Sequence, residues 1–156
     1  MDAATGARVT TVVEADLTEL GPSLLEYARF YGEDPAPEDL HAMASAFLTD
    51  GSGTQLVARV DGVVVGHATV LWSWDTTLGL PLAVMEDLFV RAAARRLGVG
   101  RALLEACREL AAGRGCRWLQ WQTAPDNAVA QALYDSLGGQ RSTWYTYRLP
   151  TGSAAT

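Results

Sequence analysis

The sequence predicts an α/β fold in which helices flank a mixed β-sheet. Short β-branched runs bounded by Gly and Pro turns indicate strands, and amphipathic stretches between some of them indicate helices. The pair Asp61-Gly62 between two apolar runs is a strong hairpin signal, and a hairpin requires antiparallel strands. A later strand–helix–strand stretch requires a parallel pair. The sheet is therefore expected to contain both kinds of pairing.

Each element is placed by its own start and stop signals. Asp16 is a candidate N-cap, Gly21-Pro22 is expected to kink or restart the first helix, and Gly138 is expected to end the last one. The expected elements in chain order are a strand at 8–14, helices at 16–28 and 38–48, strands at 55–60, 63–74 and 84–90, a helix at 99–113, a strand at 118–123, a helix at 126–138 and a strand at 141–149.

The length and composition predict one domain over residues 1–156. About 8–149 would be ordered and 150–156 would form a mobile tail. The chain lacks a signal-peptide pattern and any apolar run near the ~20 residues that cross a bilayer, so we expect a cytoplasmic protein with no membrane partner. Cys107 and Cys116 show neither metal-ligand spacing nor a disulfide pattern, and we expect no metal site.

Charge is distributed unevenly along the chain. The net charge is −6, which argues against nucleic acid as a partner. Residues 1–87 contain 14 acidic residues and 3 arginines, whereas residues 88–156 contain 4 acidic residues and 9 arginines. This layout suits a cationic ligand near the first half and an anionic ligand near the second. A solvated surface with uneven charge is the alternative.

A strand–turn–helix stretch at residues 84–103 has the composition of an anion site. Two adjacent carboxylates, Glu86 and Asp87, interrupt an apolar strand, and a turn rich in Arg and Gly precedes a helix whose first N–H groups have no internal partner. A dinucleotide fingerprint would need Gly at Leu103, and a phosphate-binding P-loop would need a Lys, which this chain lacks. What remains is the pattern Arg95-x-x-Gly98-x-Gly100.

This pattern resembles motif A of the GNAT superfamily of acyl-CoA-dependent N-acyltransferases, [Arg/Gln]-x-x-Gly-x-[Gly/Ala]. The run from Asn127 through Ala130, Leu133 and Tyr134 to Gly138 resembles motif B. The expected order β-α-α-β-β-β-α-β-α-β is the GNAT order, so the likeness covers nearly the whole chain and implies a GNAT fold with a splayed, bulged strand at the acyl-CoA site.

A narrower likeness connects this chain with the diamine acetyltransferases, the spermidine/spermine and thialysine type. It rests on the run Met-Glu-Asp-Leu-Phe-Val at 85–90 and on Leu78-Gly79 upstream. Two departures limit it. Arg96 stands where GNAT sequences usually have Gly, and the stretch at 123–127 lacks the Trp-Asn pair common in diamine acetyltransferases.

The resemblance implies acetyl-CoA as the cofactor. Backbone N–H groups of residues 97–102 would bind the CoA pyrophosphate, and nearby arginines would add positive charge. The backbone of Leu88 and Val90 would pair with the pantetheine amides. The implied cofactor-binding residues are Leu88, Phe89, Val90, Arg95, Arg96, Leu97, Gly98, Val99, Gly100, Arg101, Ala102, Asn127 and Tyr134.

Two residues are candidates for proton transfer. The resemblance favours Tyr134 as the general acid that protonates the leaving CoA thiolate, with a rim aromatic as the structural alternative. The incoming amine must lose a proton before it attacks, because amines are mostly protonated at pH 7. We favour Glu86 as the acceptor of that proton. Asp87, a water molecule, or no catalytic role for either carboxylate remain alternatives.

Three further side chains are weighed for the acceptor site. Trp72 and Trp74 alternate on one face of their strand and could hold a cationic acceptor by cation–π contacts, although core or dimer packing is the alternative. His67, on the opposite face, is interpreted as a satisfied surface or core residue. The expected substrate-binding residues are Glu86, Asp87, Trp72 and Trp74.

The predicted function is transfer of acetyl from acetyl-CoA to a primary amine of a small cationic acceptor, by direct attack in a ternary complex. An aminoglycoside-like acceptor, a protein N-terminus or a lysine side chain remain alternatives. So does a module that binds acyl-CoA without turnover. We expect the protein to form a homodimer, and we expect its acceptor to be a small-molecule amine.

Overall fold

A two-residue turn at Asp61 and Gly62 organises the sheet in the computed structural model, which describes residues 6–153. The φ angles of Asp61 and Gly62 are 49° and 80°, and two consecutive left-handed residues are what a type I′ hairpin turn requires. The turn joins β2 (Gly53–Val60) to β3 (Val63–Asp75) in antiparallel pairing. The predicted hairpin is confirmed.

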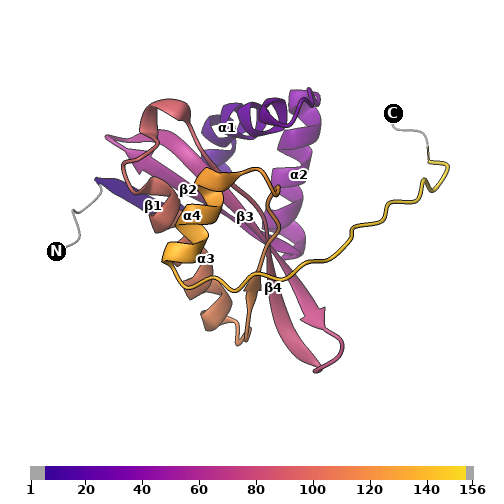
Figure 1. Cartoon of the computed structure of the whole chain (residues 1–156). Coiled ribbons are helices and arrows are strands. Elements are labelled where there is room, and N and C mark those ends of the chain that lie inside the picture. The colour runs from indigo at the N-terminus through magenta and orange to yellow at the C-terminus, as the bar shows by residue number, and fades with distance from the viewer. Residues whose placement is uncertain (1–5, 154–156) are drawn as a thin grey trace. The chain divides into compact units, whose positions relative to one another are not determined.

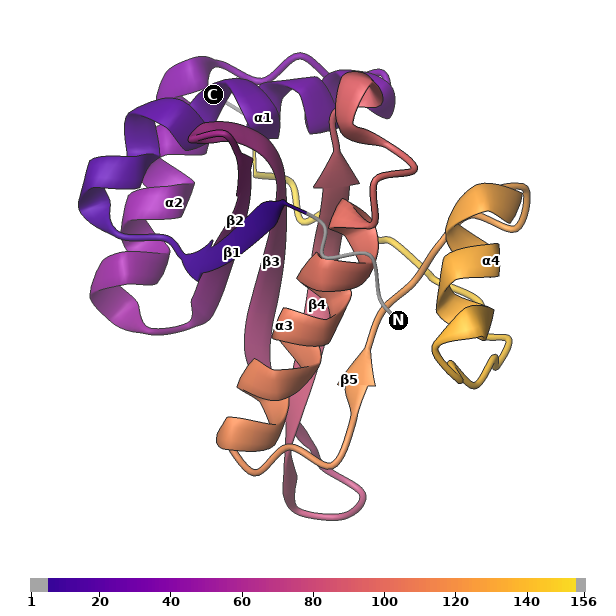
Figure 2. The same cartoon turned by 90° about the vertical axis from the view of Figure 1, so that its left-hand side faces the viewer.

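The chain divides into two units, Met1–Gln122 and Thr123–Thr156, which are described separately. The first contains a five-stranded sheet in the order β1-β2-β3-β4-β5, of which Figure 1 labels the first four strands and Figure 2 all five. Its outer strands are β1 (Ala7–Thr11), antiparallel to β2, and β5 (Leu119–Gln120), parallel to β4 (Leu80–Val90). The mixed sheet is confirmed, although β5 is shorter than the predicted strand at 118–123.

Helices cover both faces of this sheet. α1 (Leu17–Phe30) and α2 (Pro37–Asp50) lie on one face, and α3 (Val99–Gly113) lies on the other (Figure 2). α1 runs through Pro22 as one helix, so the expected restart there is wrong. Short 3-10 turns precede α1 at Glu14–Asp16 and α3 at Ala92–Ala94. None of the helices within residues 6–153 is long and apolar enough to span a bilayer.

The apolar stripe of α1 explains how it packs. Leu17, Leu20 and Leu24 recur at helical spacing and are buried with Val57 of β2 and Val64 of β3. Ser23 lies on the same stripe and is fully buried, although a serine side chain adds little apolar contact. A polar residue at such a position needs a hydrogen-bond partner, and this requirement leads to the candidate site.

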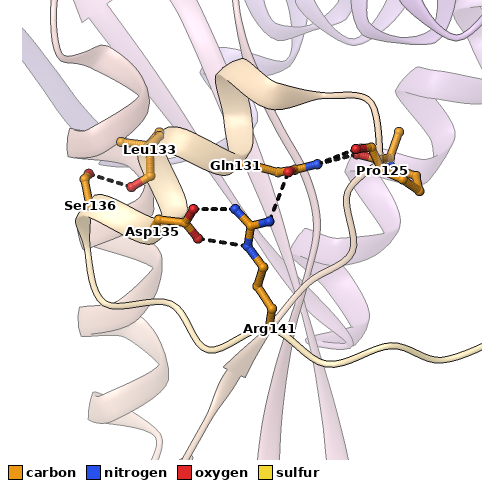
Figure 3. A network of polar contacts seen from close by, with 7 residues as sticks. Pro125, Gln131, Leu133, Asp135, Ser136 and Arg141 are labelled. Carbon is orange, nitrogen blue, oxygen red and sulfur yellow. Dashed lines mark hydrogen bonds and ion pairs between the residues drawn. The ribbon is translucent and has the colours of Figure 1, made fainter.

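The second unit is built around α4 (Ala128–Ser136). Arg141 donates to both oxygens of Asp135, and its NH1 group donates to Gln131 Oε1 at 3.2 Å (Figure 3). The Gln131 amide in turn donates to the carbonyls of Ala124 and Pro125, each at 3.0 Å. These bonds connect α4 with the segment that precedes it, through Gln131, and with the segment that follows it, through Arg141.

The predicted last strand at 141–149 is wrong for the residues described. This segment has no strand pairing, and its alternating large side chains are exposed, with Trp144 at 84% and Tyr147 at 91%. Alternation predicts a strand only where a neighbouring strand supplies hydrogen bonds and an apolar surface. Part of the expected mobile tail, residues 154–156, lies outside the described residues.

Substitution of the turn glycine should destabilise the sheet. Gly62→Ala places a Cβ at a φ of 80° and should cost about 1 kcal/mol, which corresponds to a fall in Tm of roughly 2–4 °C. Gly113→Ala is the matched control, because Gly113 ends a helix and has open space around a new Cβ. It should leave Tm unchanged or raise it. An equal fall in both variants, measured by thermal scanning, would contradict the turn assignment.

Candidate active site

A β-bulge interrupts β4 at the two carboxylates. Thr69 of β3 lies opposite Asp87 and Val70 lies opposite Met85, so Glu86 is an extra residue without a partner on β3. In a regular strand two neighbours point to opposite faces, and a bulge relaxes this rule. Tyr27 of α1 experiences the negative charges of both Asp87 and Glu86, which raise the pKa of its phenol beyond the larger effect of burial. Thr69 lies on the same face of β3 as His67, which contacts Tyr27 of α1, and Val70 lies on the other face. Asp87, opposite Thr69, therefore faces α1, and so does Glu86, which follows Met85 on the α3 face.

The two carboxylates have different surroundings. Glu86 is exposed, whereas the side chain of Asp87 is only 11% exposed. One carboxylate oxygen of Asp87 lies 3.7 Å from Nε2 of His67, and His67 is fully buried. The other ring nitrogen of His67, Nδ1, lies 2.7 Å from the Ser23 hydroxyl. A buried polar line thus runs from α1 through β3 to β4.

Aromatic rings enclose this line. Tyr27 makes edge contacts with His67 and Phe89, at centroid distances of 5.9 and 6.1 Å. Phe89 is 8% exposed and packs beside the His67 ring. The Phe89 side chain therefore faces α1 and is used in packing, and its predicted contact with the cofactor stays a prediction.

The outer edge of β4 presents backbone groups. The Arg91 N–H donates to the Val65 carbonyl at 2.9 Å, which makes these residues a hydrogen-bonded pair. Because such pairs alternate along an antiparallel ladder, the opposed pair Val90 and Gly66 is not bonded, nor is the pair Leu88 and Ala68. The N–H and C=O groups of Leu88 and Val90 therefore point away from β3.

β5 covers only the start of this edge. The Ala83 N–H donates to the Trp118 carbonyl at 3.3 Å, and the pairing of β4 with β5 extends only to Val84 opposite Gln120. Within the described part of the first unit, no strand pairs with the outer edge of β4 beyond that point. The predicted splay between the two strands is confirmed, and Leu88 lies on the part of the edge that it leaves open.

The arginine and glycine turn follows this open edge. Gly98 has a φ of 78° and directly precedes α3, and Arg96 has a φ of 67°, a left-handed value that is unusual for a residue with a side chain. Glycine adopts a φ of this sign without a steric penalty, whereas a residue with a Cβ does not. The first N–H groups of α3, those of Val99 and Gly100, have no partner within the helix. They are suited to an anion.

One predicted pyrophosphate donor is already engaged. The Ala102 N–H donates to the Gly98 carbonyl at 3.0 Å, so this group is used within the helix, and the predicted place of Ala102 at the cofactor stays a prediction. Arg95 donates from Nε to the Val90 carbonyl at 3.0 Å, and this bond links the turn to the end of β4. Arg91 pairs with Glu26 of α1 at 3.0 Å. The turn before α3 and helix α1 are therefore both bonded to residues at the end of β4.

The motif B residues lie in the second unit. Asn127 is the N-cap of α4, and its side-chain oxygen accepts from the Ala130 N–H at 3.3 Å. Tyr134 lies in the last part of the same helix, and its carbonyl accepts from the Gly139 N–H at 3.0 Å. The predicted roles of Asn127 and Tyr134 at the cofactor stay predictions.

The tryptophans are not part of the carboxylate cluster. Trp72 donates to the Thr54 hydroxyl at 3.1 Å, and the guanidinium of Arg114 lies 4.1 Å from the centre of its ring. Arg114 directly follows α3, so Trp72 faces the α3 side, whereas Glu86 and Asp87 face α1. Trp74 is 63% exposed near the end of β3. Trp72 thus lies across the sheet from the two carboxylates, and the predicted role of Trp72 and Trp74 at the acceptor stays a prediction.

Other polar and apolar features lie elsewhere. A groove between α1 and α2 is lined by residues such as Leu17, Pro22 and His41, and none of the predicted site residues borders it. Burial raises the pKa of the Cys107 thiol to about 12, which agrees with a structural role. Among residues 6–153, no group of three His, Cys, Asp or Glu side chains has the arrangement of a metal site.

Sequence reasoning missed Ser23 and underestimated His67. The interpretation of His67 as a satisfied core residue rested on the lack of a partner at ligand spacing, but Asp87 is 20 positions away and lies next to it through the β3–β4 pairing. Ser23 carried a usable signal, because it interrupts the apolar stripe between Leu20 and Leu24. A buried hydroxyl on such a stripe predicts a polar partner on the sheet.

Comparison with known sequences finds one family. The sequence profile of the acetyltransferase (GNAT) family matches residues 21–138. An uncharacterised N-acetyltransferase of Bacillus subtilis is 26% identical, over 85% of this chain and 89% of the relative. Aminoglycoside N(6′)-acetyltransferase type 1 of Salmonella typhimurium is 29% identical, over 65% and 73%. Thialysine N-epsilon-acetyltransferase of Caenorhabditis elegans is 38% identical, over 60% of each chain.

Comparison with solved structures finds the same fold. A crystal structure of a probable acetyltransferase superposes with a TM-score of 0.84 and 24% identity, covering 94% of this chain and 99% of the other. An aminoglycoside N-acetyltransferase in complex with CoA superposes with a TM-score of 0.80 and 21% identity, covering 93% and 95%. The predicted fold class is confirmed.

The left-handed conformation of Arg96 has a measurable cost. Arg96→Gly should relieve a strain of about 1 kcal/mol and should raise Tm, even though glycine is more flexible in the unfolded chain. Arg95→Gly is the control, because the φ of Arg95 is −69° and its side chain bonds to Val90. That variant should lower Tm. A lower Tm for Arg96→Gly would show that its side chain stabilises the turn by more than the strain costs.

Proposed function

The chain belongs to the acetyltransferase (GNAT) family, whose members use acetyl-CoA, and we propose that it transfers the acetyl group to a primary amine of a small cationic acceptor. The observation that carries this proposal is the bulged β4. One side of the strand bears Glu86 and Asp87, and its outer edge offers backbone groups to an extended ligand. The transfer proceeds by direct attack in a ternary complex.

The acyl-CoA lies along the open edge of β4 in this proposal. Backbone groups of Leu88 and the N–H of Val90 pair with the pantetheine amides, since both point away from β3 and only the Val90 carbonyl is held by Arg95. The pyrophosphate binds the N–H groups at the start of α3. The donors are those of Leu97, Gly98, Val99, Gly100 and Arg101, with positive charge from Arg95, Arg96 and Arg101.

Glu86 accepts the proton of the incoming ammonium in this reaction. It accepts that proton directly or through one water molecule, and because it is exposed it can release the proton to solvent. The neutral amine then attacks the thioester carbonyl, a C–N bond forms, the C–S bond breaks, and the attacking nitrogen releases its second proton to solvent as the amide forms. Tyr134 donates its phenolic proton to the CoA thiolate and is reprotonated from solvent.

Charge supports a cationic acceptor. The C-terminal part of α1 presents exposed Phe30 and Tyr31 beside Tyr27, and aromatic faces attract ammonium groups. Glu86 and Asp87 add negative charge on the same side, and the C-terminus of a helix also favours a cation. An aminoglycoside-like acceptor is the second candidate, because a relative carries that name. A protein amine is not favoured by any contact within residues 6–153.

We also propose that the protein is cytoplasmic and that it forms a homodimer. A cytoplasmic enzyme would have acetyl-CoA available. A homodimer is supported by exposed tryptophans on the first unit, Trp74 at 63% and Trp118 at 47%, because Trp is enriched at protein interfaces.

An amine panel tests the acceptor class. With acetyl-CoA, release of free CoA should be faster with 1,4-diaminobutane than with glutamate, and kcat/KM for the diamine should fall with added salt. The uncharged trifluoroethylamine is the control and should show little salt dependence. Glu86→Gln should shift the activity of the diamine toward higher pH, because less help remains for deprotonating the ammonium. Faster turnover of glutamate would refute a cationic acceptor, and no turnover of any amine would favour a binding module.

Tyr134→Phe tests the general acid. The variant should retain acetyl-CoA affinity and lose about 10²–10⁴-fold in kcat, since only the proton donor to the leaving thiolate is removed. Tyr145→Phe, an exposed tyrosine in the same unit, is the control and should match the unmodified protein. A kcat within about twofold for Tyr134→Phe, on an acceptor for which chemistry limits the rate, would mean that another group protonates the thiolate.

A further inference from the structure

A buried polar line beneath the carboxylates has no role in the proposed chemistry so far. His67 is fully buried in β3, and its Nε2 atom lies 3.7 Å from an oxygen of Asp87. Both of these atoms are buried, and neither has a hydrogen-bond partner among the described residues. Two unsatisfied atoms that face one another are a costly arrangement unless they bond together.

Hydrogen-bond accounting selects one form of the His67 ring. Burial is the main effect that lowers the pKa of His67, so the ring is neutral near pH 7 and carries one N–H. If Nδ1 carried it, Nε2 and the Asp87 oxygen would be two acceptors facing one another. If Nε2 carries it, the Ser23 hydroxyl donates to Nδ1 and Nε2–H points at Asp87. The second form gives Nδ1 a donor and directs Nε2–H toward the Asp87 oxygen that faces it, 3.7 Å away.

This line is not a nucleophilic triad, although it contains Ser, His and Asp. The Ser23 side chain is fully buried on the core stripe of α1, so no substrate carbonyl can reach its oxygen. The end that reaches the surface is Asp87, which retains 11% exposure. Any effect of the line on chemistry must therefore be exerted through the Asp87 carboxylate.

We propose that the Asp87 carboxylate binds the ammonium group of the acceptor, and that His67 and Ser23 are positioning residues that hold this carboxylate in place. This inference rests on the proposed acetyl transfer and divides the work of the two carboxylates. Asp87, anchored from below, binds the cation. Glu86, the exposed extra residue of the bulge, exchanges the proton with water.

The charges around His67 support this arrangement. Asp87 from β4 and Glu26 from α1 favour a charged ring, whereas Arg91 after β4 disfavours it. Glu26 and Arg91 form an ion pair at 3.0 Å, so their opposite effects on the pKa of His67 offset one another. Tyr27 of α1 covers the His67 ring. Asp87 is thus the anion that Nε2–H faces, and its remaining negative charge is directed away from His67.

The ring form can be measured without turnover. In a long-range ¹⁵N–¹H correlation spectrum of the full chain, the ring of His67 should be neutral between pH 6.5 and 8 with its proton on Nε2. Addition of 1,4-diaminobutane should shift the His67 ring signals. A proton on Nδ1, or a ring that titrates in this range, would overturn the proposal.

Variants separate positioning from stability. His67→Leu should raise KM for 1,4-diaminobutane about tenfold, while KM for uncharged trifluoroethylamine and for acetyl-CoA stays within about twofold. His67→Gln, whose amide can still donate toward Asp87, should recover most of the loss. Leu20→Ala is the control, because it opens a cavity in the core beneath the helix that carries Ser23 and removes no polar group, and it should lower Tm with no change in either KM.

Failure of this inference differs from failure of the proposed function. If the unmodified protein releases no CoA with any amine, acetyl transfer to small amines is wrong, and the His67 spectrum with and without diamine still decides whether Asp87 seats a cation. If the protein is active and His67→Leu raises KM for both amines equally, the positioning role is wrong. Asp87→Asn keeps the side-chain size and should show the same selective rise as His67→Leu, so the test survives poor folding of that variant.

Discussion

The bulge at Glu86 is the constraint on which the candidate site depends. It adds one residue to β4 without adding one to β3, so the alternation of backbone direction changes along the strand. Before the bulge, Ala83 turns its N–H toward β5, and after it Leu88 and Val90 turn theirs outward. The same extra residue allows the two neighbouring carboxylates to lie on one face of the sheet, which a regular strand would not. A regular strand in this place could not provide both the open edge and the acidic side.

The separation of opposite charges follows from the layers of the fold. Basic groups gather at the turn before α3, and the carboxylates face α1 across the sheet from that helix. The Arg91–Glu26 pair lies where the two regions meet, at the end of β4. Because an exposed ion pair contributes little energy, this contact matters more for placing α1 against β4 than for stability. An anionic and a cationic ligand can thus approach one strand from different directions.

Local signals predicted much of the fold, and tertiary contacts determined what they missed. Asp61-Gly62 specified its turn by backbone conformation alone, and the Arg95 to Gly100 pattern located the start of α3. β4 begins at Leu80, earlier than the expected start at 84, and it includes Pro81, which is paired with Trp74 although proline is rare inside a strand. The partnership of His67 with Ser23 joins two elements 44 positions apart, and spacing along the chain carries no record of it. The strand expected at 141–149 had the right alternation without a paired neighbour.

The short pairing between β4 and β5 has a consequence for how the molecule folds. β2, β3 and β4 are linked by tight turns, so their contacts have low sequence separation and need little loop-closure entropy. β5 joins only after α3 has crossed the sheet, and it gains a two-residue parallel ladder. The meander is thus the natural nucleus, and β5 is the natural place for local opening in the native state. We therefore expect the N–H groups on the open edge of β4, beyond the pairing with β5, to exchange readily with solvent.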